Sequence, residues 1–282
     1  MIVLGENRYG KSRVRLMKVI RCPEGHSVFE WTVDVYLTGE FTDCFAAGDN
    51  SGILPTDTMK NTIYSRARLS SANCMENFAI ELSRYLIENN PHADSATVAI
   101  RGTHWRRIIE GDRIYETAFQ HGSDDSDTTS VTFSRTAGLT CRSGVENLSV
   151  LKTAKSAFSG FMRDSLTTLK ETEDRLFGTL MRANWEYAES VSDFPPLRQK
   201  VMKLLLGSFA EHDSKSVQQT LYAMAEAVLI AVPEIIEIEL SMPNKHCNLV
   251  DLSAFGQDNP NEIFVPIDEP HGSIEARLRR AG

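Results

Sequence analysis

Residues 29–38 read Phe29-Glu30-Trp31-Thr32-Val33-Asp34-Val35-Tyr36-Leu37-Thr38. Large apolar side chains occupy every second position, and the side chains between them are mostly charged or hydroxylated. A period of two is typical of a strand that buries one face and leaves the other polar. The stretch therefore predicts a sheet with one side packed against a core.

Helical and strand patterns follow this first strand. Apolar side chains from Met75 to Leu86 fall on one stripe of a helix expected at residues 74–89, which Asn90-Pro91 ends. A weaker helical pattern follows Thr56-Asp57. Further strands are expected around residues 97–100 and 129–133.

The second half of the chain repeats this plan. Its predicted elements are strands at 131–142 and 146–155, helices near 201–209 and 217–228, and strands at 236–240 and 274–278. Two strands, helices and two more strands, occurring twice, predict an α+β fold of two tandem units, residues 1–137 and 138–282, with antiparallel sheets and helices on one face. The polar residues 122–127 predict an exposed loop near this boundary, without the terminal Glu of a calcium loop.

Composition narrows the classes of partner. The chain has 282 residues, 41% of them hydrophobic and 24% charged, with a formal net charge of −8. This is the composition of a soluble globular protein. The negative charge argues against a nucleic-acid partner, and an anionic ligand must be held by local positive groups.

Targeting signals and cysteines predict a cytoplasmic, bacterial-like protein. The first residues lack the layout of a signal peptide, and no apolar stretch is long enough to span a membrane. The five cysteines are scattered without paired spacing, which is typical of reduced thiols. The final residues differ from a peroxisomal tripeptide.

Arg175 and Gln218 are candidates for holding a planar anion. A guanidinium is planar and always charged, so it can grip an anionic edge with two parallel hydrogen bonds. A plainer interpretation pairs Arg175 with Glu171 on a helix. Ser216 to Gln219 fits a capping box in which Gln219 caps the helix and the amide of Gln218 is available for a ligand. The plainer interpretation of Gln218 is an ordinary surface residue. The backbone N–H of Val217 would suit an anion at the helix start.

Proton transfer could involve Lys11 and Thr56. A threonine hydroxyl both gives and accepts a proton, so Thr56 could relay between bound water and a base, which Lys11 supplies if partial burial favours its neutral form. The plainer role of Thr56-Asp57 is a helix cap. Asn244 and His246 are two apart and would point the same way on a strand. His246 could join the proton traffic or be a structural histidine.

These polar segments, in this order, resemble the urate oxidase family from about residue 3 to residue 280. The resemblance rests on Tyr9-Gly10-Lys11, Thr56 to Asn61, Phe158 to Arg175, Val217-Gln218, Ser241 to His246 and Pro266 to Arg279. It is weaker over residues 92–128. Glu173 departs from the tryptophan of some family members, but lies outside the expected site.

The resemblance implies the role of each site residue. Phe158 would stack on the purine ring, Arg175 and Gln218 would clamp urate, and Lys11, Thr56 and His246 would remove a proton. Asn244, Thr56 and Ile274 would form the oxygen site. The substrate-binding residues would be Thr56, Asp57, Phe158, Arg175, Val217, Gln218 and Asn244.

The resemblance also implies the assembly and the reaction. Tandem tunnelling-fold units would join around the barrel of a homotetramer, with Lys11, Thr56 and Asp57 of one subunit facing Arg175, Gln218 and Phe158 of its neighbour. Urate and O2 would be the substrates. Neither a metal nor an organic cofactor is expected, because urate itself is the reductant.

Two other functions stay open from the sequence. A metal-dependent pterin or GTP-processing enzyme of the same fold would need a His/Cys zinc cluster. The close pairs are Cys22 with His26 and His246 with Cys247, and neither belongs to an obvious ligand set. A purine-binding protein without turnover would keep Arg175 and Gln218, but Lys11, Thr56 and Asn244 together favour an enzyme.

Overall fold

The chain forms two compact units. The computed structural model describes residues 2–281, apart from the side chain of Asp268. Unit 1 comprises Met1–Gly144 and Glu186–Pro195, and unit 2 comprises Val145–Trp185 and Pro196–Gly282. The predicted boundary between residues 137 and 138 stays a prediction, because the compact units are defined by contacts and not by a repeat.

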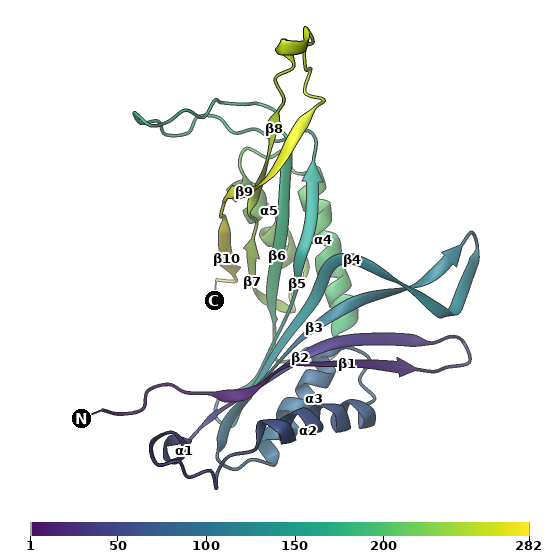
Figure 1. Cartoon of the computed structure of the whole chain (residues 1–282), viewed down its shortest axis with the longest axis vertical. Coiled ribbons are helices and arrows are strands. Elements are labelled where there is room, and N and C mark those ends of the chain that lie inside the picture. The colour runs from purple at the N-terminus through teal and green to yellow at the C-terminus, as the bar shows by residue number, and fades with distance from the viewer. Residues whose placement is uncertain (1, 282) are drawn as a thin grey trace. The chain divides into compact units, whose positions relative to one another are not determined.

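Unit 1 is an antiparallel sheet with helices on one face (Figure 1). Its elements are β1 (Tyr9–Ile20), β2 (Ser27–Gly39), α1 (Thr42–Ala47), α2 (Thr56–Leu69), α3 (Met75–Glu88), β3 (Ala93–Glu110) and β4 (Arg113–Ser134). The strands lie in the order β1-β2-β3-β4, and each pair of neighbours is antiparallel. Helix α3 packs on β3 and β4, and α2 packs on β1.

The alternating pattern of β2 forms the core of unit 1. Trp31, Val33, Val35 and Leu37 are buried, as predicted. Trp31 stacks on Phe78 of α3 with ring centres 5.4 Å apart. Burying one such side chain stabilises a fold by about 1.5–3 kcal/mol, so the contact holds the helix layer on the sheet.

Unit 2 repeats the order of strands, helices and strands. Its elements are β5 (Gly138–Lys152, which begins in unit 1), β6 (Phe177–Tyr187), α4 (Phe194–Glu211), α5 (Val217–Ala231), β7 (Ile235–Ser241), β8 (Asn244–Leu249), the short 3-10 helix η1 (Ser253–Phe255), β9 (Phe264–Gly272) and β10 (Glu275–Arg279). Strand β10 pairs with β7, and β8 pairs with β6 and β9. Helix α5 packs on β7 and β10. The predicted α+β class with antiparallel sheets is confirmed.

Three sequence predictions about individual elements are wrong. Residues 122–127 lie inside β4, where Ser126 pairs with Thr103, and are not a loop. The Asp125 carboxylate of β4 lies 3.4 Å from the His104 imidazole of the neighbouring strand β3. The strand predicted at 131–142 is interrupted between β4 and β5. The strand predicted at 236–240 begins one residue earlier, and Ile236 is exposed whereas Ile235 is buried. Ile238 and Leu240 are buried, so the alternation fails only at the start of the strand.

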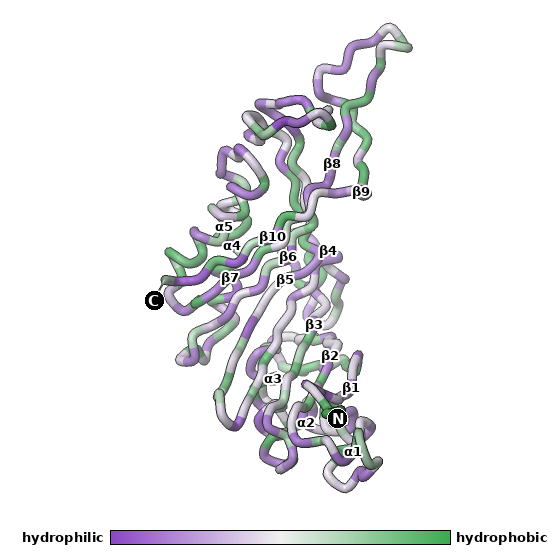
Figure 2. The backbone as a smooth tube through the Cα atoms, turned by 90° about the vertical axis from the view of Figure 1, so that its left-hand side faces the viewer, coloured by the Kyte–Doolittle hydropathy of each residue, from purple (hydrophilic) through white to green (hydrophobic). Residues whose placement is uncertain are grey.

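Hydropathy along the backbone follows these layers. Figure 2 shows green apolar stretches along the strands and helices, and purple stretches in several of the loops between them. None of the helices formed by residues 2–281 is long and apolar enough to cross a membrane. No disulfide joins any two of the five cysteines, all of which lie within residues 2–281.

Candidate active site

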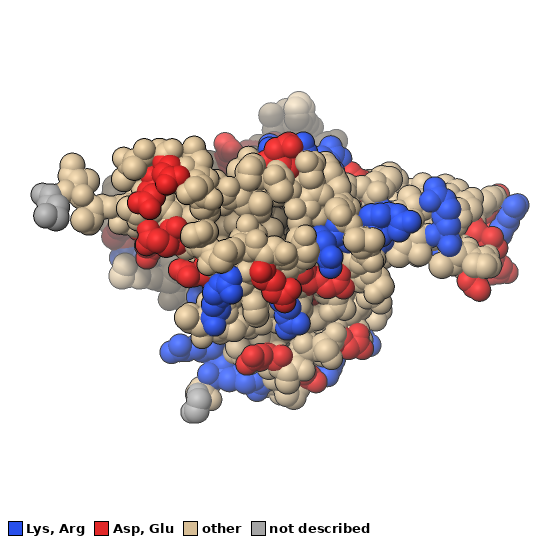
Figure 3. Space-filling view, turned by 90° about the horizontal axis from the view of Figure 1, so that it is seen from below, with Lys and Arg blue, Asp and Glu red and all other residues tan. Residues whose placement is uncertain are grey.

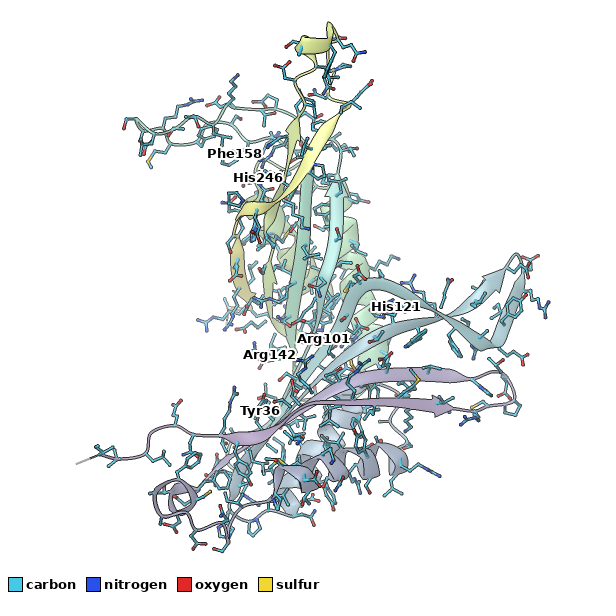
Figure 4. The ribbon with its side chains drawn as sticks, viewed as in Figure 1. Tyr36, Arg101, His121, Arg142, Phe158 and His246 are labelled. Carbon is cyan, nitrogen blue, oxygen red and sulfur yellow. The ribbon has the colours of Figure 1, made fainter. Side chains whose placement is uncertain are left out.

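Phe158 lies at the base of the long loop between β5 and β6 (Figures 1 and 4). Arg175, near the end of this loop, contacts Phe158 there. Backbone hydrogen bonds close this loop: the Phe158 N–H donates to the Thr172 carbonyl (2.8 Å), and the Thr172 N–H donates back (3.1 Å). The closure brings the guanidinium carbon of Arg175 to 5.3 Å from the centre of the Phe158 ring. An aromatic face and a planar cation therefore lie together, which is a cation–π arrangement.

Arg175 retains hydrogen-bonding capacity at this place. Its Nε is buried and makes no hydrogen bond within the described residues. Burial lowers the pKa of Arg175, although a guanidinium remains charged at neutral pH. The alternative pairing with Glu171 on a helix is wrong, because this segment is not helical and Glu171 faces Arg163 at 3.4 Å. A buried guanidinium N–H without an acceptor favours an anionic ligand.

Phe158 lies outside the buried core of unit 2. Its side chain is only partly buried, and its ring stacks on Phe161 with centres 5.0 Å apart and planes 14° apart. Phe158 is thus held by a second aromatic ring outside the buried core of unit 2.

Helix α5 places Val217 and Gln218 at its first two positions. The Ser216 hydroxyl accepts from the Gln219 N–H (3.1 Å), which confirms the predicted N-cap. The Gln219 side chain accepts from the Lys215 N–H (2.9 Å), one residue earlier than in a capping box. Gln218 is left exposed while Val217 is buried. The N–H groups at a helix start have no intrahelical acceptor and favour an anion.

Asn244 and Ile274 both lie near Gly272. Asn244 begins β8 and pairs with Gly272 of β9 and with Thr179 of β6. A Cβ on Gly272 would lie 3.4 Å from the Ile274 side chain and 3.8 Å from that of Asn244. Asn244 and Ile274 therefore both lie close to Gly272.

His246 is the third residue of β8. It pairs with Ile267, and the register with β9 shifts between Asn244 and His246. Its side chain is partly buried. Because of this irregularity, the relative direction of the Asn244 and His246 side chains stays a prediction.

Unit 1 holds the other three predicted residues. Lys11 lies in β1, directly before a bulge at which the Arg13 N–H donates to the Asp34 carboxylate. Thr56 and Asp57 begin α2 and are exposed. Pro55 holds the N-cap position without a side-chain hydrogen bond, so the helix-cap interpretation of Thr56 and Asp57 is wrong.

Asp57 has a cationic environment. The pKa of its carboxyl is lowered by the hydrogen bond and charge of Lys60, by the hydrogen bond from Asn61, and also by the charge of Lys11. The structure therefore brings Lys11 within electrostatic range of Asp57. Thr56 precedes Asp57 at the helix start.

The structure draws attention to a residue that the sequence did not. Thr179 is 1% exposed, and its hydroxyl has no hydrogen-bond partner in the described residues, beside Asn244 on the neighbouring strand. The alternation of β6 marks Thr179 as inward-facing, but an unsatisfied hydroxyl cannot be read from a sequence. Thr179 is therefore a further polar group next to the predicted oxygen site.

Two surface hollows of unit 2 lie elsewhere. One, of about 650 Å³, is lined by residues around Leu249–Asn259, and the other, of about 560 Å³, by residues of α5 and the C-terminal strand. Neither contains a predicted site residue. Among the described side chains, no group of three or more His, Cys, Asp or Glu could hold a metal ion.

Fold and side chains together define an α+β protein whose candidate site suits a planar anion. Comparison with known proteins gives the family. The sequence model of the Uricase family matches residues 7–132 and 141–275. A uricase of Arthrobacter globiformis is 41% identical over 281 residues, covering 100% of this chain and 91% of the relative. A uricase of Dictyostelium discoideum is 37% identical, covering 100% and 99%. The chain belongs to the uricase family.

Solved structures agree with this assignment. The crystal structure of the Arthrobacter globiformis uricase superposes with a TM-score of 0.95 at 41% identity, covering 100% of this chain and 96% of that one. A uricase from Bacillus fastidious superposes with a TM-score of 0.82 at 22% identity, covering 97% and 93%. The second comparison shows a shared fold.

Proposed function

We propose that the chain is a urate oxidase, which converts urate, O2 and water to 5-hydroxyisourate and hydrogen peroxide in purine degradation. The observation that carries this proposal is the Arg175 guanidinium over the Phe158 ring in a chain of the uricase family. Urate is a flat purine that is anionic at neutral pH. A stacking face with an adjoining planar cation matches both properties.

Three side chains bind the substrate. Phe158 stacks on the purine ring, Arg175 forms two parallel hydrogen bonds to one edge, and the Gln218 amide offers a donor and an acceptor to another. The N–H of Val217 and the residues Thr56, Asp57 and Asn244 also contact the substrate. Lys and Arg side chains are interspersed with Asp and Glu on the face shown in Figure 3. Local capture of the anion is therefore needed in a chain with a net charge of −8.

The reaction needs no reductant other than urate. Lys11, Thr56 and His246 remove a proton, and the resulting dianion passes an electron to O2 held near Thr56, Asn244 and Ile274. Recombination gives a hydroperoxide, hydrogen peroxide leaves, and water adds to the ring. Urate loses two electrons overall, O2 gains them, and water supplies the new hydroxyl group. Neither a metal nor an organic cofactor takes part in this scheme.

We further propose a homotetramer in which subunits share each site. Lys11, Thr56 and Asp57 of one subunit would face Arg175, Gln218 and Phe158 of another. The loop that carries Phe158 supports an assembly, because its Met162 and Leu166 are 92% and 84% exposed. Large exposed apolar side chains are typical of protein interfaces.

We also propose a cytoplasmic location. Five cysteines without a disulfide among them support a reducing compartment. The bacterial relative is consistent with this location.

The test follows loss of the near-ultraviolet urate band and oxygen uptake together, with metal-stripped protein in excess chelator. One O2 consumed and one peroxide formed per urate is the expected result. Tight urate binding without turnover would identify a binding protein. Activity that disappears with the chelator and returns with zinc would favour the metal-dependent alternative.

A further inference from the structure

Lys152, the last residue of β5, is a buried lysine outside the residues assigned above to urate and oxygen. Its side chain is 7% exposed. Its ammonium donates a hydrogen bond to the His212 carbonyl and lies 5.8 Å from the centre of the Phe209 ring. A buried charge is costly unless it is well paired, and a bond from a charged donor is stronger than a neutral one. Lys152 therefore holds the His212 carbonyl firmly.

The segment held by this bond, residues 212–216, is joined on one side to the residues just before Phe158. The Ser214 N–H donates to the Lys155 carbonyl (3.0 Å), and the Ala157 N–H donates to the Ser214 carbonyl (2.7 Å). Ser156 and Ser214 form an isolated parallel bridge. Phe158 is the next residue after these bonds, so its position depends on residues 212–216.

The same segment is joined on its other side to helix α5. His212 Nδ1 lies 3.1 Å from the hydroxyl of the buried Thr220. The Ser214 hydroxyl donates to the Ser216 carbonyl (3.1 Å), and Ser216 is the N-cap of α5. Gln218 is the second residue of that helix. Residues 212–216 thus connect the base of Phe158 with the helix start that presents Gln218.

We propose that Lys152 is a positioning residue for the urate site. By fixing the His212 carbonyl, it holds residues 212–216 and so aligns the Phe158 ring with the Gln218 amide. This inference rests on the proposed function. A stacking face and an edge-reading amide bind a rigid planar ligand together only when their relative position is fixed beforehand.

The test compares Lys152→Met, Lys152→Arg and the matched control Lys155→Met in the full-length protein. Lys155 is a neighbouring exposed lysine, so its replacement removes the same charge without the buried bond. Urate binding is measured by titration without oxygen, which gives a Kd independent of the amount of folded protein. We expect the Kd to rise about tenfold in Lys152→Met, less in Lys152→Arg, and not at all in Lys155→Met. Equal Kd values in all three variants would overturn the proposal.

Thr220→Val provides a second variant if Lys152→Met does not fold. It removes the His212 partner with little change in volume, and we expect a Kd about threefold higher. An unchanged Kd in Thr220→Val would also overturn the proposal.

Amide hydrogen exchange separates this inference from the proposed function. The Ala157 and Ser214 N–H groups carry the bonds between the two segments. They should exchange about tenfold faster in Lys152→Met than in Lys155→Met. Equal exchange would refute the role of Lys152 even in an active enzyme. If the wild type does not bind urate but exchange is still faster in Lys152→Met than in Lys155→Met, only the urate assignment is refuted.

Discussion

The guanidinium carbon of Arg175 lies 5.3 Å from the centre of the Phe158 ring, although a long loop separates the two residues in sequence. The arrangement depends on the paired backbone bonds between Phe158 and Thr172. It places the buried Nε–H of Arg175, which has no hydrogen-bond partner among residues 2–281, beside an aromatic face. The first prediction follows from this pair.

Arg175→Ala should raise the Kd for urate by about a hundredfold or more, because it removes a charge-assisted, two-bond contact to an anion. Arg163→Ala is the matched control, since Arg163 lies in the same loop but is exposed and faces Glu171. Anaerobic titration with urate measures both. Equal affinity in the two variants would contradict the assignment of Arg175.

Two neighbouring glutamines should show opposite effects. Gln218 is exposed, so Gln218→Leu should raise the Kd for urate about tenfold and leave the melting temperature unchanged. Gln219 accepts from the Lys215 N–H, so Gln219→Leu should lower stability by about 1 kcal/mol and bind urate normally. Urate titration and thermal unfolding of both variants check this. A larger affinity loss in Gln219→Leu would reverse the two roles.

Gly10 cannot be replaced without moving a strand. A Cβ at this position would lie 1.9 Å from the Val35 carbonyl oxygen, a backbone atom of the paired strand. Gly10→Ala should therefore lower the free energy of unfolding by about 2–4 kcal/mol and displace the adjacent Lys11. Gly5→Ala is the control, because nothing lies within 4 Å of its Cβ. Urea denaturation of both variants is the measurement. Equal midpoints would show that β1 and β2 can move apart at Gly10 without loss of stability.

His212 should make stability depend on pH. Burial is the main cause that lowers its pKa, the charge of Lys152 adds to this, and Asp213 opposes it. The folded state therefore disfavours the protonated ring, and the unfolded state binds more protons as pH falls below its ordinary pKa of about 6.5. Above that value the full contribution of His212 to the free energy of unfolding is present. It is lost progressively as the pH falls from there to the lower pKa of the folded state.

His212→Gln should consequently show a shallower loss of stability than the wild type between about pH 7 and pH 5. Urea denaturation of both proteins across this range is the measurement. Parallel curves would mean that burial of His212 does not affect its protonation.

Most of the secondary structure could be predicted from the sequence. The alternation at residues 29–38 and the apolar stripe of residues 75–86 gave β2 and α3, because both patterns reflect burial of one face. Residues 122–127 were predicted wrongly, since polar side chains do not reveal that a strand continues through them with His104 beside Asp125. The sequence also allows a helical pair between Arg175 and Glu171, but this segment is not helical.

The sequence by itself determined most of the elements, the Ser216 cap of α5 and the family resemblance, because these depend on local spacing and residue type. Only the tertiary structure decided that Arg175 lies over Phe158, that Asn244 and Ile274 both lie near Gly272, and that Lys152 reaches the His212 carbonyl. Each of these contacts joins segments distant in the chain. Their positions are set by strand pairing, loop closure and burial, which no local pattern specifies.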